Sequence, residues 1–164
     1  MSTYTYPHTI DNGAGEQLTV IRRVQDPAGD YFEVENLVKP GSGPPMHVHH
    51  QVEALTVQQG RLGYQRPGEP PHFAGPGETV VFEQGESHKF WNARDEDLRC
   101  TGYVQPPDNV EYFLTEIFKS QRENGGAGRT CLMWHSWRAG TGASSPWRRS
   151  RRWYSVWFSL CWWP

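Results

Sequence analysis

The residues of this sequence that are best suited to chemistry are three histidines and one glutamate. His47 and His49 are two positions apart in a stretch expected to be a strand, so their rings project from the same face. Glu53 follows four residues later, and the next histidine expected on a strand is His88. Burying three imidazoles and a carboxylate unpaired would be costly, whereas one divalent metal ion would satisfy all four groups. By itself, a His-x-His pair more often marks a solvated strand face, so the metal hypothesis depends on the surrounding pattern.

This set of donors limits the kinds of metal that the site would hold. Imidazole nitrogens with one carboxylate suit Fe, Mn, Ni, Cu or Zn. Octahedral coordination by four side chains would leave two positions open for water, substrate or dioxygen. The sequence therefore predicts a mononuclear transition-metal site, without indicating which metal it prefers.

The sequence around these four residues has the pattern of an all-β domain. Short segments rich in Val, Ile, Leu, Tyr and Phe alternate with turns that contain glycine and proline. Many short strands with such punctuation are typical of a sandwich or barrel. The strands that we expect span residues 17–25, 30–39, 46–50, 52–59, 61–66, 78–83, 87–93 and 97–105.

One helix is expected after the strands, beginning just beyond Pro106 and Pro107. Asp108 is suited to cap its N-terminus, and the sequence Asn124-Gly125-Gly126 would end it. Five apolar residues at helical spacing form one stripe that would pack across the barrel: Val110, Phe113, Leu114, Ile117 and Phe118.

Two longer motifs around the candidate ligands resemble the signature motifs of the cupin family. The first matches at each fixed position, which are Gly41, His47, His49, Glu53 and Gly60. The second has one departure, because Glu83 stands where the family usually has proline; its other fixed positions are Gly77, Gly85, His88 and Asn92. The resemblance covers about residues 30–105, and with flanking elements about 1–125.

The resemblance implies a double-stranded β-helix, or jelly-roll barrel, with a metal ion inside one end. It implies that the ligands of this divalent transition metal are His47, His49, Glu53 and His88. It also implies a structural role for Asn92 and turns at Gly60, Gly77 and Gly85. The missing proline at Glu83 concerns the stiffness of a turn and removes no ligand.

Two further residues near the candidate ligands are placed by strand alternation. His50 points to the face opposite that of His49, so we expect it at the surface or behind the ligands. Phe90 shares the face of His88, so we expect it to line the pocket. The other aromatic residues of the barrel are expected to be core.

The resemblance leaves three functions open. The first is a mononuclear metal-dependent oxygenase, of the kind that quercetin dioxygenase-like cupins exemplify, acting on a small enol or phenol-type molecule. There Glu53 would be a ligand and a proton acceptor. The second is a metal-dependent isomerase or lyase that needs no oxygen. The third is a non-enzymatic sensor or storage module for a small ligand.

The charge of the sequence changes sharply near residue 120. Residues 1–120 contain 9 Lys and Arg against 17 Asp and Glu, whereas residues 121–164 contain 7 Arg and one acid. Seven of the eight tryptophans lie in the second part. We therefore expect a barrel domain with its helix at residues 1–125 and an anomalous tail at 126–164. Three interpretations of the tail stay open: a membrane-surface anchor, a nucleic-acid patch, and an out-of-frame translation.

Composition also bears on compartment and partners. The three cysteines are widely spaced and odd in number, which disfavours a disulfide scaffold or zinc finger and suits a reducing compartment. No secretion signal or membrane-spanning run is recognisable, so we expect a cytoplasmic location. The acidic domain makes nucleic-acid binding unexpected, and only the tail would reach a membrane. We expect a small-molecule ligand and a homodimer built on barrel edges, with residues 3–10 taking part.

Overall fold

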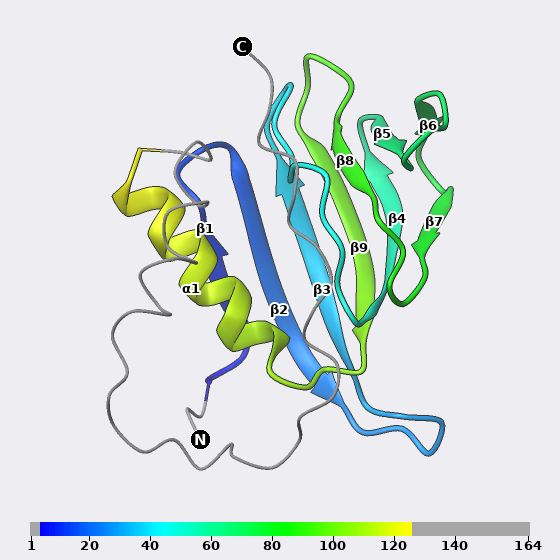
Figure 1. The fold of residues 1–164 in the computed structure, drawn as a ribbon. Helices are drawn as coiled ribbons and strands as arrows, with labels where there is room; N and C mark the ends of the chain where they lie inside the picture. The colour runs from blue at the N-terminus through cyan, green and yellow to red at the C-terminus, as the bar shows by residue number, and fades with distance from the viewer. Residues whose placement is uncertain (1–3, 126–164) are drawn as a thin grey trace. The chain divides into compact units, whose positions relative to one another are not determined.

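The computed structural model of the protein describes residues 4–125, which form two antiparallel sheets and one helix (Figure 1). The six-stranded sheet has the order β1 (His8–Asp11), β2 (Glu16–Val24), β3 (Tyr31–Val38), β9 (Leu98–Gln105), β4 (Val52–Gln59) and β7 (Thr79–Phe82). The three-stranded sheet has the order β6 (His72–Ala74), β5 (Leu62–Gln65) and β8 (Lys89–Asn92). The predicted all-β jelly-roll fold with one C-terminal helix is confirmed. The tail predicted at 126–164 lies outside the described residues, so its three interpretations stay open.

The two sheets pack on a shared core, which explains why the strands form where they do. In β3 the buried residues alternate with more exposed ones, as the two-residue period of a strand requires. The large sheet contributes Val38, Leu55, Val57 and Leu98, each fully buried, and the small sheet contributes Leu62 and Phe90. This core fills the barrel between the two sheets and supports the strands that carry the candidate ligands.

A second core lies between the large sheet and helix α1 (Val110–Glu123). Phe118 is buried there with Leu18, Val20 and Phe32, and Figure 1 shows the helix running along β1 and β2. The helix thus covers the N-terminal strands of the barrel. No helix in residues 4–125 has both the length and the apolar character that crossing a membrane requires.

The helix departs from its prediction at two residues. Asn109, not Asp108, precedes the first turn, because Asp108 has a φ of 32° in the turn that joins Pro107 to Val110. Asp108 thus lies one residue before the N-cap position and does not cap the helix. Phe113 is 50 % exposed and lies outside the buried stripe. The predicted end is confirmed, since the backbone N–H of Asn124 donates to the carbonyl of Ser120.

The strand predictions hold to within one or two residues, with one error and two omissions. Residues 46–50 do not form a strand, and only His47 makes an isolated bridge there. Pro44 and Pro45 precede this segment, and proline cannot donate to a ladder. The short strands β1 and β6 were not among those expected. β1 pairs with β2 of the same chain, whereas the homodimer stays a prediction.

Candidate metal centre

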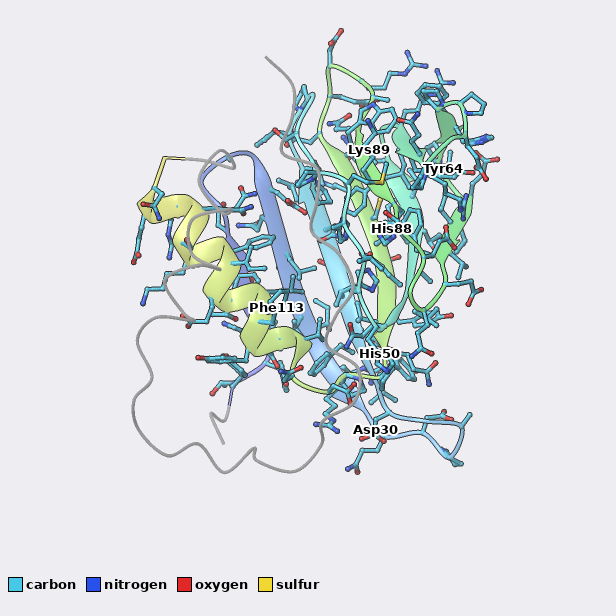
Figure 2. The ribbon with its side chains drawn as sticks, in the orientation of Figure 1. Asp30, His50, Tyr64, His88, Lys89 and Phe113 are labelled. Carbon is cyan, nitrogen blue, oxygen red and sulfur yellow. The ribbon has the colours of Figure 1, made fainter. Side chains whose placement is uncertain are left out.

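The four predicted ligands come together although they lie on three different segments. His47 and His49 belong to the irregular segment between β3 and β4, Glu53 is the second residue of β4, and His88 directly precedes β8. His47 and His88 are joined by two backbone hydrogen bonds of 2.9 Å, one in each direction. The backbone N–H of Gly85 donates to the carbonyl of His49 at 2.9 Å. These bonds connect the two halves of the cluster, and Figure 2 shows His88 inside the barrel.

The donor atoms are close enough together for one metal ion. One ligand atom from each of the four residues lies within 4.8 Å of all the others. A metal bound at about 2.1 Å would place neighbouring ligand atoms about 3.0 Å apart and opposite ones about 4.2 Å apart. A small contraction of the cluster would therefore suffice to coordinate a metal.

Each histidine is held by its Nδ1 atom, which leaves Nε2 facing the others. The Nδ1 atoms of His47 and His49 lie 2.8 Å from the carbonyls of Pro45 and Gln51, and that of His88 lies 3.0 Å from the carbonyl of Glu86. A carbonyl only accepts, so each Nδ1 carries a proton and each Nε2 is left to face the cluster, where that of His49 lies 3.3 Å from Oε2 of Glu53. Metal-binding histidines are oriented in this way by a hydrogen bond from the other ring nitrogen.

His88 gives the clearest test of whether a metal fits. Its side chain is fully buried, and within residues 4–125 its Nε2 has no hydrogen-bond partner. The nearest carboxylate oxygen, Oε2 of Glu53, is 3.5 Å away. A buried polar atom without a partner costs about 1–3 kcal/mol, and a metal ion would remove that cost. The residues present therefore fit a divalent transition metal.

Electrostatics in the cluster favours the ionised form of Glu53 and the neutral form of His47, but the protonated form of His49. Burial alone would raise the pKa of Glu53, but the hydrogen bond from His49 and the nearby charges of His49 and His88 outweigh it and hold the pKa at about 2. Burial, aided by the charge of His88, lowers the pKa of His47. Burial also opposes the charged form of His49, yet its bond to Glu53 raises the pKa above the usual value. Glu53 is thus an anionic donor among imidazoles.

The aromatic residue next to the cluster is Phe82 rather than Phe90. The ring of Phe82 stacks on that of His88 with centroids 3.9 Å apart and planes 5° apart. Phe90 is buried in the same core, with its ring centroid 6.4 Å from that of Phe82, and its pocket role stays a prediction. The register pairs Glu53 with Phe82 across β4 and β7. In the sequence, the alternation of the apolar residues Val80 and Phe82 was the signal that Phe82 points to the inner face of its strand.

Other residues of the two motifs behave as expected. His50 is exposed, and the side-chain amide of Gln84 lies 2.8 Å from its ring nitrogens. Asn92 is buried and donates to the carbonyls of Val38 and Glu96, which confirms its structural role. The three glycines predicted in turns all have positive φ: Gly60, Gly77 and Gly85.

The turn at Glu83, where the family usually has proline, is closed by hydrogen bonds instead. The backbone N–H of Glu86 donates to the carbonyl of Glu83 at 3.0 Å. The N–H of Glu83, which a proline would lack, donates to the Glu86 carboxylate at 3.0 Å. The turn therefore keeps a defined shape, and Glu86 also accepts the bond from His88 Nδ1 through its carbonyl.

Comparison with known proteins agrees with this fold. Residues 28–103 match the family described as Cupin domain, and a search of curated proteins gave no significant match. KdgF from Halomonas sp. is similar with a TM-score of 0.52 and 18 % identity over 63 % of this chain and 92 % of that one. AerE from Microcystis aeruginosa has a TM-score of 0.53 and 18 % identity over 60 % of this chain and 45 % of that one.

A third similar structure is a predicted oxalate decarboxylase from Thermotoga maritima. Its TM-score is 0.48, with 20 % identity over 60 % of this chain and 90 % of that one. At such identities the similarity concerns the fold, and the chemistry has to be argued from the four side chains themselves.

Proposed function

We propose that the protein is a mononuclear metal-dependent oxygenase acting on a small enol or phenol-type molecule, a proposal supported by the match of residues 28–103 to the family described as Cupin domain. Its metal would be held by His47, His49, Glu53 and His88. The observation that supports the proposal is the buried Nε2 of His88, which has no hydrogen-bond partner in residues 4–125 and faces an ionised carboxylate. Bound there, a redox-active metal would supply adjacent positions for a substrate oxygen and for dioxygen.

The protein's own residues set the direction from which a small molecule would reach this centre. The His88 side chain is fully buried, whereas those of His49 and Glu53 are 22 % and 13 % exposed. Access would therefore be from the side of His49 and Glu53. Behind His88, the stacked ring of Phe82 and the apolar core exclude water.

Glu53 has two proposed roles, of which the ligand role has the stronger support. A pKa of about 2 keeps its carboxylate ionised throughout the neutral range. Such a weak base would accept a hydrogen bond from the acidic O–H of a bound substrate more readily than it would retain the proton. Its role as the final proton acceptor is part of the proposal.

The proposal is tested by metal content and oxygen consumption in matched variants. Elemental analysis after reconstitution should find one metal per chain in the wild type and in the surface variant His50→Ala, but little in His49→Ala. An oxygen electrode should then record uptake with some member of a panel of flavonols and 1,3-diketones.

Each outcome of these measurements has a distinct meaning. A protein that stays metal-free after reconstitution would overturn the metal site. Turnover that proceeds equally well without oxygen would replace the oxygenase by an isomerase or lyase. Tight binding of a small molecule without turnover would point to a sensor or storage module.

A further inference from the structure

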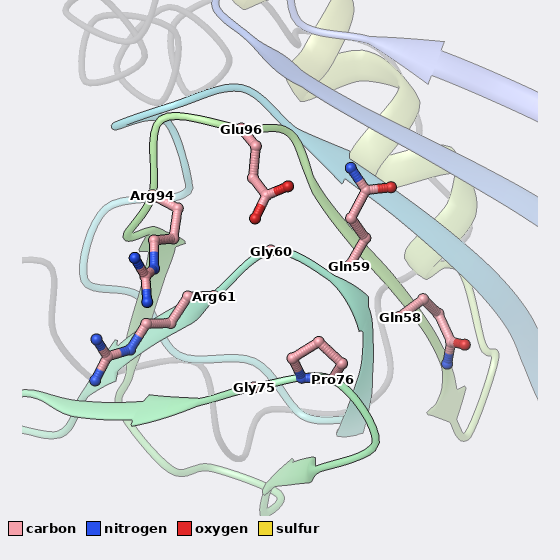
Figure 3. Close-up of a pocket in the computed structure, with 8 residues that line it drawn as sticks. All are labelled: Gln58, Gln59, Gly60, Arg61, Gly75, Pro76, Arg94 and Glu96. Carbon is pink, nitrogen blue, oxygen red and sulfur yellow. The ribbon is translucent and has the colours of Figure 1, made fainter.

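A cavity of about 570 Å³ lies beside Gly60, at the end of β4 that is far from Glu53 (Figure 3). Three turns meet there, and its lining comprises Gln58, Gln59, Gly60, Arg61, Gly75, Pro76, Arg94 and Glu96. Glu53 lies near the start of β4 and Gln58 near its end, so the two sites are about 17 Å apart at about 3.3 Å per residue. The fully buried Leu55 and Val57 lie between them on the same strand, so the cavity does not share the metal site.

Two arginines give this cavity its charge. Arg61 and Arg94 are both exposed, and Figure 3 shows their guanidinium groups at the same edge of the cavity. Neither has an ion pair with an acid of residues 4–125, whereas the side chains of Arg22, Arg23 and Arg66 do. Guanidinium groups remain protonated at any physiological pH, so the two charges repel each other unless an anion lies between them.

The side chain of Arg61 and the backbone of Arg94 are anchored, which lowers the entropy lost when the two residues bind a ligand. The guanidinium carbon of Arg61 lies 4.3 Å from the centroid of Phe73, whose ring meets that of Trp91 edge-on. The carbonyl of Arg61 accepts from the N–H of Ala93 at 2.9 Å. The N–H of Arg94 donates to the side-chain oxygen of the buried Asn92 at 2.9 Å. Two guanidinium groups at one edge of the cavity, one of them held over an aromatic ring, suit bidentate binding of an oxyanion.

The acids near Arg94 restrict which anion fits. Asp97 is paired with Lys39 at 2.8 Å, so its charge is largely compensated. Glu96 points its carboxylate into the cavity in Figure 3 and has no ion pair with a cation of the described part of the chain. Its charge would repel a bare anion, but it would accept a hydrogen bond from a hydroxyl group beside the anionic group.

We propose that this cavity binds the phosphate group of a small hydroxylated phosphate monoester. Arg61 and Arg94 hold the phosphate oxygens, and Glu96 accepts a hydrogen bond from a hydroxyl of the same ligand. The site is independent of the metal centre and of the reaction proposed there.

The test is calorimetric titration of the full-length protein at low ionic strength with glycerol 3-phosphate and with inorganic phosphate. Glycerol 3-phosphate should bind saturably and more tightly than inorganic phosphate. Arg61→Gln and Arg94→Gln should each weaken its binding by roughly tenfold or more, as expected for loss of a charge-assisted bond. Arg94→Lys, which keeps the charge but loses the bidentate geometry, should bind with intermediate affinity.

Two further variants make the result specific. Arg22→Gln removes an exposed arginine far along β2 and should bind like the wild type, which controls for non-specific loss of positive charge. Glu96→Gln should bind inorganic phosphate more tightly and lose much of the preference for the ester. The proposal is overturned by non-saturable binding, by equal binding in the Arg61, Arg94 and Arg22 variants, or by an ester preference that Glu96→Gln leaves unchanged. Bound metal, measured in parallel, should not change.

Discussion

A buried carboxylate at the start of β2 makes the stability of this protein depend on pH. Glu16 is 8 % exposed, and burial, aided by the nearby charge of Glu53, raises its pKa from 4.5 to about 7. Within residues 4–125 its side chain has one weak polar contact, a 3.3 Å bond from the amide of Asn12. The folded protein therefore retains the proton on Glu16 at pH values where the unfolded chain has already lost it.

The sign and size of the effect follow from this difference in proton binding. Between pH 4.5 and about 7 the folded state binds more protons than the unfolded state, so the free energy of unfolding decreases as the pH rises. Each pKa unit corresponds to about 1.4 kcal/mol, so the ionised carboxylate destabilises the fold by about 3 kcal/mol above pH 8. Glu16→Gln removes the titrating group and nearly preserves the volume.

Urea unfolding of metal-free protein at several pH values measures this effect. At pH 4 the wild type and Glu16→Gln should have nearly equal free energies of unfolding, and at pH 8.5 the variant should be more stable by about 3 kcal/mol. Glu35→Gln, which changes an exposed carboxylate on β3, should shift stability by less than about 0.5 kcal/mol at either pH. A variant that is no more stable than the wild type at pH 8.5 would refute the assignment of a buried, destabilising carboxylate.

Other measurements test the centre, a turn, the domain boundary and the assembly. Bound metal should decrease as the pH falls from about 8 to about 5, because His49, whose pKa is raised, takes up a proton on Nε2 and can then no longer bind the metal. Elemental analysis that finds full occupancy at pH 5 would contradict this. Gly60→Ala should lower the free energy of unfolding by about 1–3 kcal/mol, since φ is +85° and its Cβ would come within 3.0 Å of a backbone oxygen; Gly68→Ala, with open space at a similar φ, should cost less. A fragment of residues 1–126 should unfold cooperatively and bind metal, and a broad transition would assign the tail a structural role. Light scattering should find that fragment dimeric, and removal of residues 1–12 should weaken the dimer if the N-terminal arm takes part.

Most strands of the barrel could be predicted from the sequence because apolar residues mark the buried face of each strand. Where a segment has one buried face, apolar alternation fixes both the strand and its register, as in β3. The two strands that were missed, β1 and β6, are 4 and 3 residues long, too short for a period-two pattern to stand out. The helix cap was misplaced for a different reason. The backbone conformation of Asp108 depends on the path of the chain through the preceding prolines. Side-chain type alone does not determine that path.

The candidate site was predicted from a strand that does not exist. Residues 46–50 were expected to bring His47 and His49 to one face by alternation, yet these two rings converge in an irregular segment. Tertiary bonds take the place of the strand: the bridge to His88 and the bond from Gly85 to His49. Residue types and spacing therefore identified the four residues that come together, but the backbone bonds that join the two halves of the cluster connect segments about forty residues apart, which local pattern does not reveal.

Backbone carbonyls, rather than side chains, orient all three imidazoles of the centre. Because Pro45, Gln51 and Glu86 contribute only their carbonyls to these bonds, substituting their side chains would leave the bonds possible, while moving the local backbone would break them. The turn that ends at Glu86 is closed by an N–H of Glu83 that the family's usual proline would not have. The hydrogen bond from the Glu83 N–H thus closes the turn although the motif's usual proline is absent. The orientation of His88, and with it the ability of the cluster to hold a metal, depends on that turn keeping its shape.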